Sequence, residues 1–203
     1  MACAVATPAT LADDDVAKET NVEAESLPVA VASQIENQFP GAKILGVSEV
    51  HVTYYEVELE SASGEIEFSF YADGSEFEGR GGRARGFGGR LDEQVDLERL
   101  PEAIHDAIEK SLLLTGLDLI ERDEKDGIVY YKAVYQEEAG QSQMRFTEAG
   151  DIIDERSTIF AESLPTAIID RIEKQVPDAQ IVDATKFRET HYKVSIQTAS
   201  AKT

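Results

Sequence analysis

The sequence is short of the residues that cross-link a protein or anchor it in a membrane. Cys3 is the only cysteine among 203 residues, which excludes an intramolecular disulfide, although many exported domains also lack cysteine. No run of apolar residues approaches the length needed to cross a bilayer, so we expect no membrane insertion. Basic residues are also scarce: the sequence has 19 Lys and Arg but 40 Asp and Glu, which gives a net charge of −21. An acidic surface of this kind repels nucleic acid and anionic membranes but accepts basic partners.

Signatures of catalysis are missing as well. The three histidines, His51, His105 and His191, show no metal-ligand spacing. The sequence contains no nucleophile elbow, phosphate loop or dinucleotide fingerprint. Residues 123–127 have the look of a calcium loop but lack its alternating acids and closing glutamate. We therefore predict a non-enzymatic protein with no catalytic residues, no metal ligands and no cofactor.

What the sequence does contain is one helix start that occurs three times, at residues 27–36, 100–109 and 164–173. Each copy opens with Leu-Pro. Proline fixes its φ near the helical value and needs no amide donor in the first turn, while the leucine before it stays outside the helix. Large apolar residues then recur every fourth position, which predicts one buried stripe on each helix. We expect helices at 28–39, 101–114 and 165–176, with Ile35, Ile108 and Ile172 buried at equivalent positions.

Segments that alternate polar and apolar residues follow each helix and predict strands. The expected strands lie at 43–52, 54–60, 65–71 and 76–78 in the first repeat, at 117–122, 128–136 and 142–147 in the second, and at 179–186 and 191–197 in the third. The third repeat lacks the hairpin partner of the other two. Tyr55 and Tyr192 stand at equal distances from their Leu-Pro pairs, whereas Tyr131 stands three residues further. We place these extra residues at 123–126.

These patterns predict an α+β fold of tandem repeats, two complete and a shortened third, in which each helix lies across one face of an antiparallel sheet. The expected divisions are a disordered N-terminal segment at 1–26, repeats at 27–78 and 99–156, a Gly/Arg-rich linker at 79–98 and a partial repeat at 163–203. We expect residues 79–90 to be an open loop, which could be halved at a cost of roughly 0.6 kcal/mol.

The first twelve residues are small and uncharged, and three aspartates follow them. This composition is typical of the end of a signal peptide with a cleavage site near Ala12, although the cationic start is missing. We expect a periplasmic or secreted protein, with a plain flexible terminus as the alternative.

An acidic surface is expected on the first repeat. If Tyr55, Val57 and Leu59 face a helix, the residues that alternate with them point outward, and residue 58 pairs with 67 and 60 with 65. Like charges opposed across two strands are destabilising. Hydration and screening can account for them, or the surface is kept for a basic partner. The predicted partner-binding residues are Tyr54, Glu56, Glu58, Glu65 and Glu67.

The order of these motifs resembles PepSY-like domains, which are related in fold to the β-lactamase-inhibitor-protein family. The resemblance rests on Leu-Pro-x-Ala-Val/Ile, on the stretch from Phe39 to Ile44, on Tyr54 to Leu59 and on the Asp73-Gly74 turn, and it covers 27–75, 100–155 and, in part, 164–197. It implies an exported protein that binds or restrains other proteins or peptides, peptidases among them, with no catalytic residues to carry over. A calcium-binding acidic protein and RNA binding through Arg80 to Arg90 are the alternatives, the latter because arginine–glycine segments bind RNA.

Overall fold

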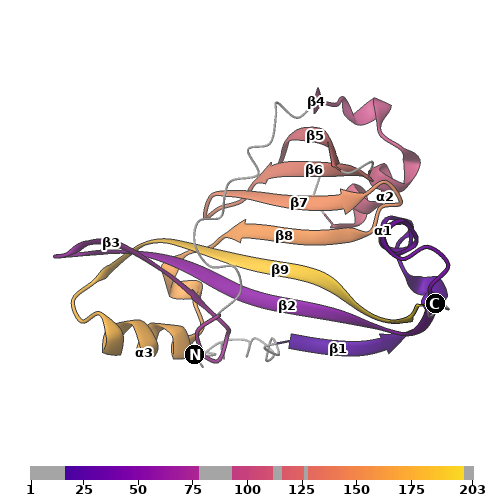
Figure 1. Ribbon diagram of the computed structural model, residues 1–203. Coiled ribbons are helices and arrows are strands. Elements are labelled where there is room, and N and C mark those ends of the chain that lie inside the picture. Colours follow the sequence, from indigo (N-terminus) through magenta and orange to yellow (C-terminus); the bar gives the residue numbers. More distant parts are fainter. Residues whose placement is uncertain (1–16, 78–92, 112–115, 126–127, 199–203) are drawn as a thin grey trace, which may run out of the picture.

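The computed structural model describes residues 17–77, 93–111, 116–125 and 128–198, and all of its strands join one antiparallel sheet (Figure 1). The strand order is β1-β2-β9-β8-β7-β6-β5-β4, and β3 pairs with the half of β2 that β1 leaves open. The predicted α+β class is confirmed. The strands are β1 Ala17–Val22, β2 Lys43–Ser61, β3 Gly64–Phe70, β4 Glu93–Gln94, β5 Leu117–Lys125, β6 Ile128–Gln136, β7 Gln141–Thr147, β8 Ile152–Thr158 and β9 Gln180–Gln197.

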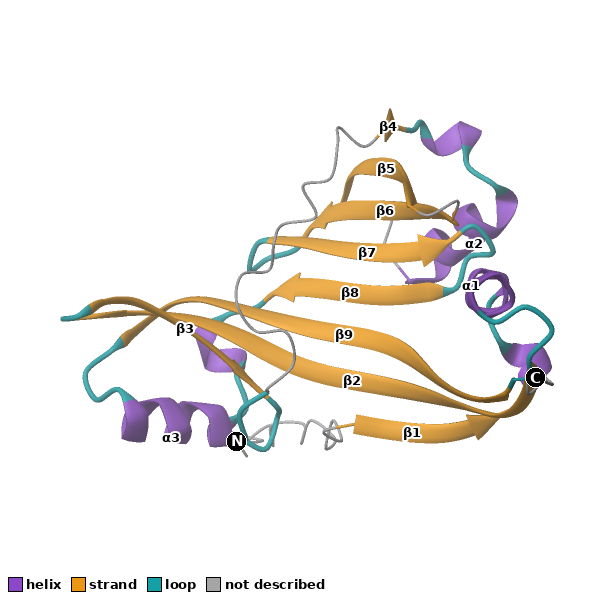
Figure 2. Ribbon diagram, in the orientation of Figure 1, coloured by secondary structure: helices purple, strands orange, loops and turns teal. Residues whose placement is uncertain are grey.

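Three helices follow the three Leu-Pro pairs: α1 (Val29–Gln38), α2 (Glu102–Ser111) and α3 (Thr166–Gln175). Each proline stands one residue before the first helical residue, and its carbonyl accepts an early helical hydrogen bond, as from the Ile168 amide to Pro165 at 2.9 Å. Figure 2 shows α3 beside the β2–β3 end of the sheet, with α1 and α2 at the opposite end of the long strands.

The second repeat folds on itself as predicted. Strands β5 and β6 pair antiparallel as far as Lys125 and Ile128, and β7 pairs with β6. Helix α2 buries Ile104 and Ile108 against this sheet, in a cluster with Tyr131 and Phe146. The expected turn residues 126 and 127 lie outside the described part of the chain.

Repeats one and three exchange strands instead. The sequence predicts two separate strands within residues 43–60 and two within residues 179–197, and this prediction is wrong. Strands β2 and β9 are each a single long strand, and they pair from Lys43 with Gln197 to Glu60 with Gln180. Where repeat two has its three extra residues, repeats one and three run on through residues 50–53 and 187–190 without a glycine. β-branched and aromatic residues there favour extended backbone, so neither strand folds back.

Because of this exchange, α3 covers the sheet of the first repeat. Its Ile168 and Ile172 pack with Tyr55, Val57 and Phe70 of β2 and β3 in one buried cluster. The two glycine turns behave alike: a Cβ on Gly74 would stand 2.6 Å from the Ala167 carbonyl of α3, and one on Gly150 would stand 2.6 Å from the Ala103 carbonyl of α2. The expectation that each helix lies on the sheet of its own repeat holds only for α2.

Helix α1 has no fully buried side chain. Burial of Ile108 and Ile172 is confirmed, at 0% and 3% exposed, but Ile35 is only half-buried. The prediction of three equivalent core isoleucines is therefore wrong for the first helix, because the β2–β3 hairpin that would have covered it packs on α3.

Part of the N-terminal segment expected to be disordered is ordered. Residues 17–22 form β1, which pairs with β2 although its side chains are almost all exposed. An edge strand can be held by its backbone ladder alone, so a lack of large apolar residues does not exclude it. The end of the expected linker likewise contains β4 and the 3-10 turn Leu97–Arg99. Residues 1–16 and 78–92, with the arginines from Arg80 to Arg90, lie outside the described residues.

Candidate functional site: the sheet face opposite the helices

Tyr54 lies on the face of β2 opposite α3 but is not exposed there. Its ring is stacked between Phe77 at 4.2 Å and Phe187 at 4.7 Å, measured between centroids, and only 7% of the residue is exposed. The chain after the Gly74 turn brings Phe77 back along β3, where the Phe77 amide donates to the Ser69 carbonyl at 2.9 Å. Tyr54 is therefore a packed residue, and the prediction that it points into solvent is wrong.

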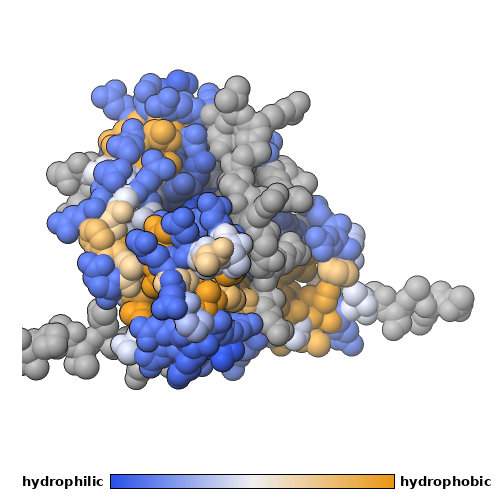
Figure 3. Space-filling view, turned by 90° about the vertical axis from the view of Figure 1, so that its left-hand side faces the viewer, coloured by the Kyte–Doolittle hydropathy of each residue, from blue (hydrophilic) through white to orange (hydrophobic). Residues whose placement is uncertain are grey.

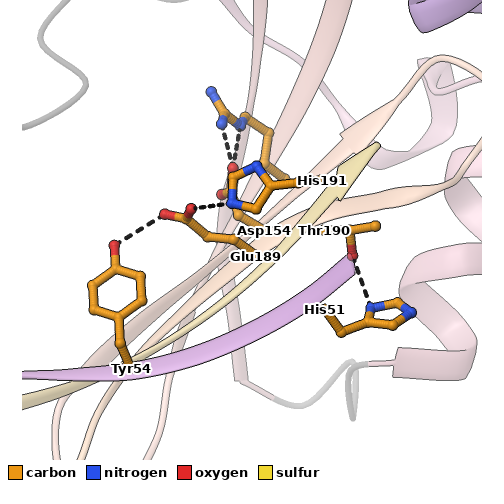
Figure 4. A network of polar contacts seen from close by, with 7 residues as sticks. His51, Tyr54, Asp154, Glu189, Thr190 and His191 are labelled. Carbon is orange, nitrogen blue, oxygen red and sulfur yellow. Dashed lines mark hydrogen bonds and ion pairs between the residues drawn. The ribbon is translucent and has the colours of Figure 1, made fainter. Parts of the chain in front are cut away.

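A chain of polar contacts starts at the Tyr54 hydroxyl (Figure 4). The hydroxyl donates to Glu189 Oε1 at 2.9 Å, and Glu189 Oε2 lies 3.0 Å from His191 Nε2. Burial, and then the Glu189 carboxylate, raise the pKa of Tyr54, so the phenol stays protonated and acts as a donor. Nearby, Arg145 Nε donates to Asp154 Oδ2 at 2.9 Å. Burial raises the pKa of Asp154, and the Arg145 guanidinium opposes that shift.

Glu56 follows Tyr54 on the same face and is half-buried. Burial raises the pKa of Glu56 first, and the negative charge of Glu67 raises it further, while Arg156 acts in the opposite direction. Glu56 is thus a partly desolvated carboxyl group, and it is less accessible to a partner than the exposed glutamates are.

The remaining glutamates form an exposed acidic row at the end of the β2–β3 hairpin. The predicted cross-strand pairs are confirmed: Glu58 faces Glu67, and Glu60 faces Glu65. On the other side of β2, Asp183 of β9 is the partner of Glu58. All five side chains are exposed, and none has an ion pair with another residue in the described ranges. We call Asp183, Glu58, Glu60, Glu65 and Glu67 the acidic row.

The four glutamates of the acidic row lie near the end of the β2–β3 hairpin, and Asp183 lies beside Glu58 on β9. This hairpin extends further than the other strands from the rest of the sheet (Figure 1). Seen from that end, the surface is largely hydrophilic and is interrupted by smaller apolar areas (Figure 3). Of the predicted residues, Glu58, Glu65 and Glu67 come together here, whereas Tyr54 and Glu56 are covered. Sequence reasoning missed Asp183, because only the pairing of β2 with β9 places it beside Glu58.

The helix side of the sheet holds a second candidate, a cavity of about 360 Å³ lined by His51, Thr190, Glu49 and Arg188, among others. His51 Nδ1 lies 3.2 Å from Thr190 Oγ1, while His51 Nε2 lies 3.7 Å from Glu49 Oε1. The second distance is too long for a hydrogen bond, so Glu49 does not orient the imidazole as the acid of a catalytic triad does. The Glu49 carboxylate instead accepts from the Tyr192 hydroxyl at 3.1 Å.

A small cluster on α2 contains metal-ligand residue types. Ligand atoms of His105, Asp106 and Glu109 lie within 4.8 Å of one another, and none of the three residues is buried. The i, i+4 spacing of His105 and Glu109 explains their 3.7 Å approach on a solvated helix. We assign this cluster no function.

Comparison with protein families gives a match to two parts of the chain. Residues 14–75 and 129–202, more than half of the chain, match the family model described as "Putative beta-lactamase-inhibitor-like, PepSY-like". Comparison with curated proteins gives no match. No helix in the described ranges has the length and apolar character needed to span a membrane.

Proposed function

Because the chain belongs to the PepSY-like family, we propose that it is a non-catalytic, exported protein that binds a basic protein or peptide through the acidic row. The observation that carries the proposal is the line Asp183–Glu58–Glu67, where three adjacent strands place carboxylates side by side with no cation from the described residues between them. The family, whose description refers to an inhibitor, supports a protein partner and a non-enzymatic role. Restraint of a peptidase is the specific form that the family suggests.

Each directly opposed pair of like charges costs a few tenths of a kcal/mol or more in a sheet, and folding gains nothing from Glu58 opposite Glu67. A basic partner would turn this repulsion into attraction and would be steered to the hairpin tip by the field of the row. The overall charge of −21 extends that field over the molecule. Export is supported by the typical extracellular or periplasmic location of PepSY-like domains.

The test is the double variant Glu58→Gln, Glu67→Gln, with Glu138→Gln, Glu148→Gln as its control. Both remove two exposed negative charges, but the control residues lie in turns away from the hairpin tip. Proteins captured from an envelope extract would be quantified by mass spectrometry across a salt series, and the melting temperature of each variant would be recorded. We expect the first variant alone to lose its captured proteins, with weaker and more salt-sensitive association, and to keep or slightly gain stability. Equal capture by both variants at every salt concentration would refute the proposal.

A further inference from the structure

Repeats one and three are related by an approximate two-fold axis that passes between β2 and β9. The alignment that places Leu27 on Leu164 also places Val52 on Glu189, and these two residues are partners in the β2–β9 ladder. The same operation exchanges α1 with α3 and β1 with β8, because β1 pairs with Val47–Val52 and β8 with the equivalent part of β9. The pair of repeats therefore resembles a strand-swapped dimer within one chain.

One element breaks this symmetry. Strand β3 pairs with β2 from Tyr55 to Ser61, and the equivalent stretch of β9 begins at Tyr192. In the described part of the chain, no strand pairs with that edge of β9, since the β8 ladder ends at Glu189. Among the residues that the structure describes, the half under α1 thus has no counterpart of β3, the third strand that is present under α3.

The side chains around α1 are less buried than the equivalent side chains around α3. Their counterparts under α3 are buried: Tyr55, Val57, Leu59, Ile168 and Ile172. The equivalent residues under α1 are all only half-buried: Tyr192, Val194, Ile196, Val31 and Ile35. Under α3 the cluster is completed by Phe70 of β3, and under α2 by Phe146 of β7, both 0% exposed. The aromatic residue of the third strand is the part that α1 is missing.

A cavity of about 100 Å³ marks the same position. It is lined by Pro28, by Ala30 and Val31 of α1, and by Tyr192, Ile152 and Ile153 among others. Ala30 is the equivalent of Ala103 and Ala167, the residues on which the turns of Gly150 and Gly74 pack. The cavity therefore lies where a glycine turn would follow a third strand.

We propose that the Tyr192–Gln197 edge of β9 and the cavity beside α1 bind an extended segment of a partner protein, which adds to the sheet as the missing strand. This is β-strand addition, in which backbone pairing gives affinity and side-chain pockets give specificity. The two complete units show what the segment must contain. Ile66, Phe68 and Phe70 alternate in β3, Met144 and Phe146 alternate in β7, and a turn with glycine follows each. The segment therefore carries large apolar residues at alternate positions, ends them with an aromatic residue, and continues into a glycine turn.

The charge of the bound segment can also be inferred. Strand β2 presents Glu58 and Glu60 to β3, but the equivalent residues of β9 are Ser195 and Gln197. A neutral or acidic strand would meet no opposed carboxylates at these two positions. This edge consequently suits a different partner from the basic one proposed for the acidic row, and it is independent of that proposal.

The probe is a labelled synthetic peptide with the sequence of residues 64–75, and its matched control carries Phe68→Ser and Phe70→Ser. We expect saturable binding of the first peptide to the full-length protein and binding about ten-fold weaker for the control, because the apolar anchors are lost. Hydrogen exchange should slow at the amides of Tyr192 to Gln197. Protection confined to β1 or β3, or equal binding of both peptides, would overturn the proposal.

Variants of the protein locate the site. Val31→Glu introduces a charge at the cavity and should weaken binding about ten-fold or more, while Ser33→Glu, at an exposed position of the same helix, should leave binding unchanged. Ala30→Leu, which fills the cavity without a charge, replaces Val31→Glu if that variant unfolds. Glu58→Gln, Glu67→Gln should bind the peptide as the wild type does, which separates this edge from the acidic row. Self-association that protects residues 192–197 without peptide would make a second copy the occupant and overturn the assignment to a partner protein.

Discussion

Truncation of the three equivalent isoleucines to alanine tests the unequal packing of the three helices. Ile108 and Ile172 are 0% and 3% exposed and lie in two separate buried clusters. Replacement of either removes a buried side chain and leaves a cavity, which should cost roughly 2–5 kcal/mol. Ile35 is half-buried. Its truncation loses about half the transfer free energy and leaves no closed cavity, so the cost should be about 1 kcal/mol.

The assay is urea unfolding at equilibrium, supported by melting temperatures. For a protein of this size each kcal/mol shifts the melting temperature by about 2–4 °C. The double variant Ile108→Ala, Ile172→Ala should lose the sum of the two single costs to within about 0.5 kcal/mol, because the two clusters share no residue.

An Ile35→Ala cost equal to that of Ile172→Ala would refute this reasoning, because it would require a closed core under α1. A negligible cost for Ile172→Ala would contradict the packing of α3 on β2 and β3.

Three further predictions concern single residues. Gly74→Ala and Gly150→Ala should each destabilise the protein by about 1–3 kcal/mol in thermal unfolding, because both glycines have a positive φ and a Cβ would meet a helix carbonyl. The control Gly46→Ala, where a Cβ meets nothing, should cost far less, and a loss of stability equal to that of the other two variants would contradict the turn–helix contact. Glu56→Gln should stabilise the protein near neutral pH but not in acid. The pKa of Glu56 is raised in the folded state, so the stability of the wild type falls as the pH rises from the ordinary pKa of 4.5 through the raised pKa. If the stability curves of wild type and variant stay parallel from acid to neutral pH, Glu56 is not desolvated. Tyr54→Phe should cost about 1–3 kcal/mol in urea unfolding by leaving the partly buried Glu189 without its phenolic donor, and a neutral effect would mean that water replaces the hydroxyl.

Local features of this fold were predictable because each depends on residues that are close together in the sequence. The Leu-Pro pairs place all three helix starts to within a residue, and the alternation from Tyr54 to Glu60 gives the register in which Glu58 meets Glu67. The turn at Asp73-Gly74 was also visible in the sequence, and it packs against the start of a helix.

Long-range pairing was not predictable in the same way. The residues at 50–53 favour extended backbone, but nothing local to them indicates that β2 pairs with β9 of the third repeat. The burial of Tyr54 depends on Phe77 and Phe187, and the place of Asp183 depends on the same β2–β9 ladder. Sequence patterns indicate which face a residue takes, whereas the neighbour on the next strand is decided by the whole sheet.

The strand exchange also sets the order in which this chain can fold during synthesis. The β2–β3 hairpin leaves the ribosome early, but the helix that covers Tyr55, Val57 and Phe70 is made much later, after the entire second repeat. Until α3 emerges, an apolar hairpin face and the long edge of β2 stay open, the kind of surface that aggregates or recruits chaperones. The second repeat can close on α2 meanwhile, so the middle of the chain should be first to become protease-resistant as it is made. The first repeat reaches its native state only together with the last.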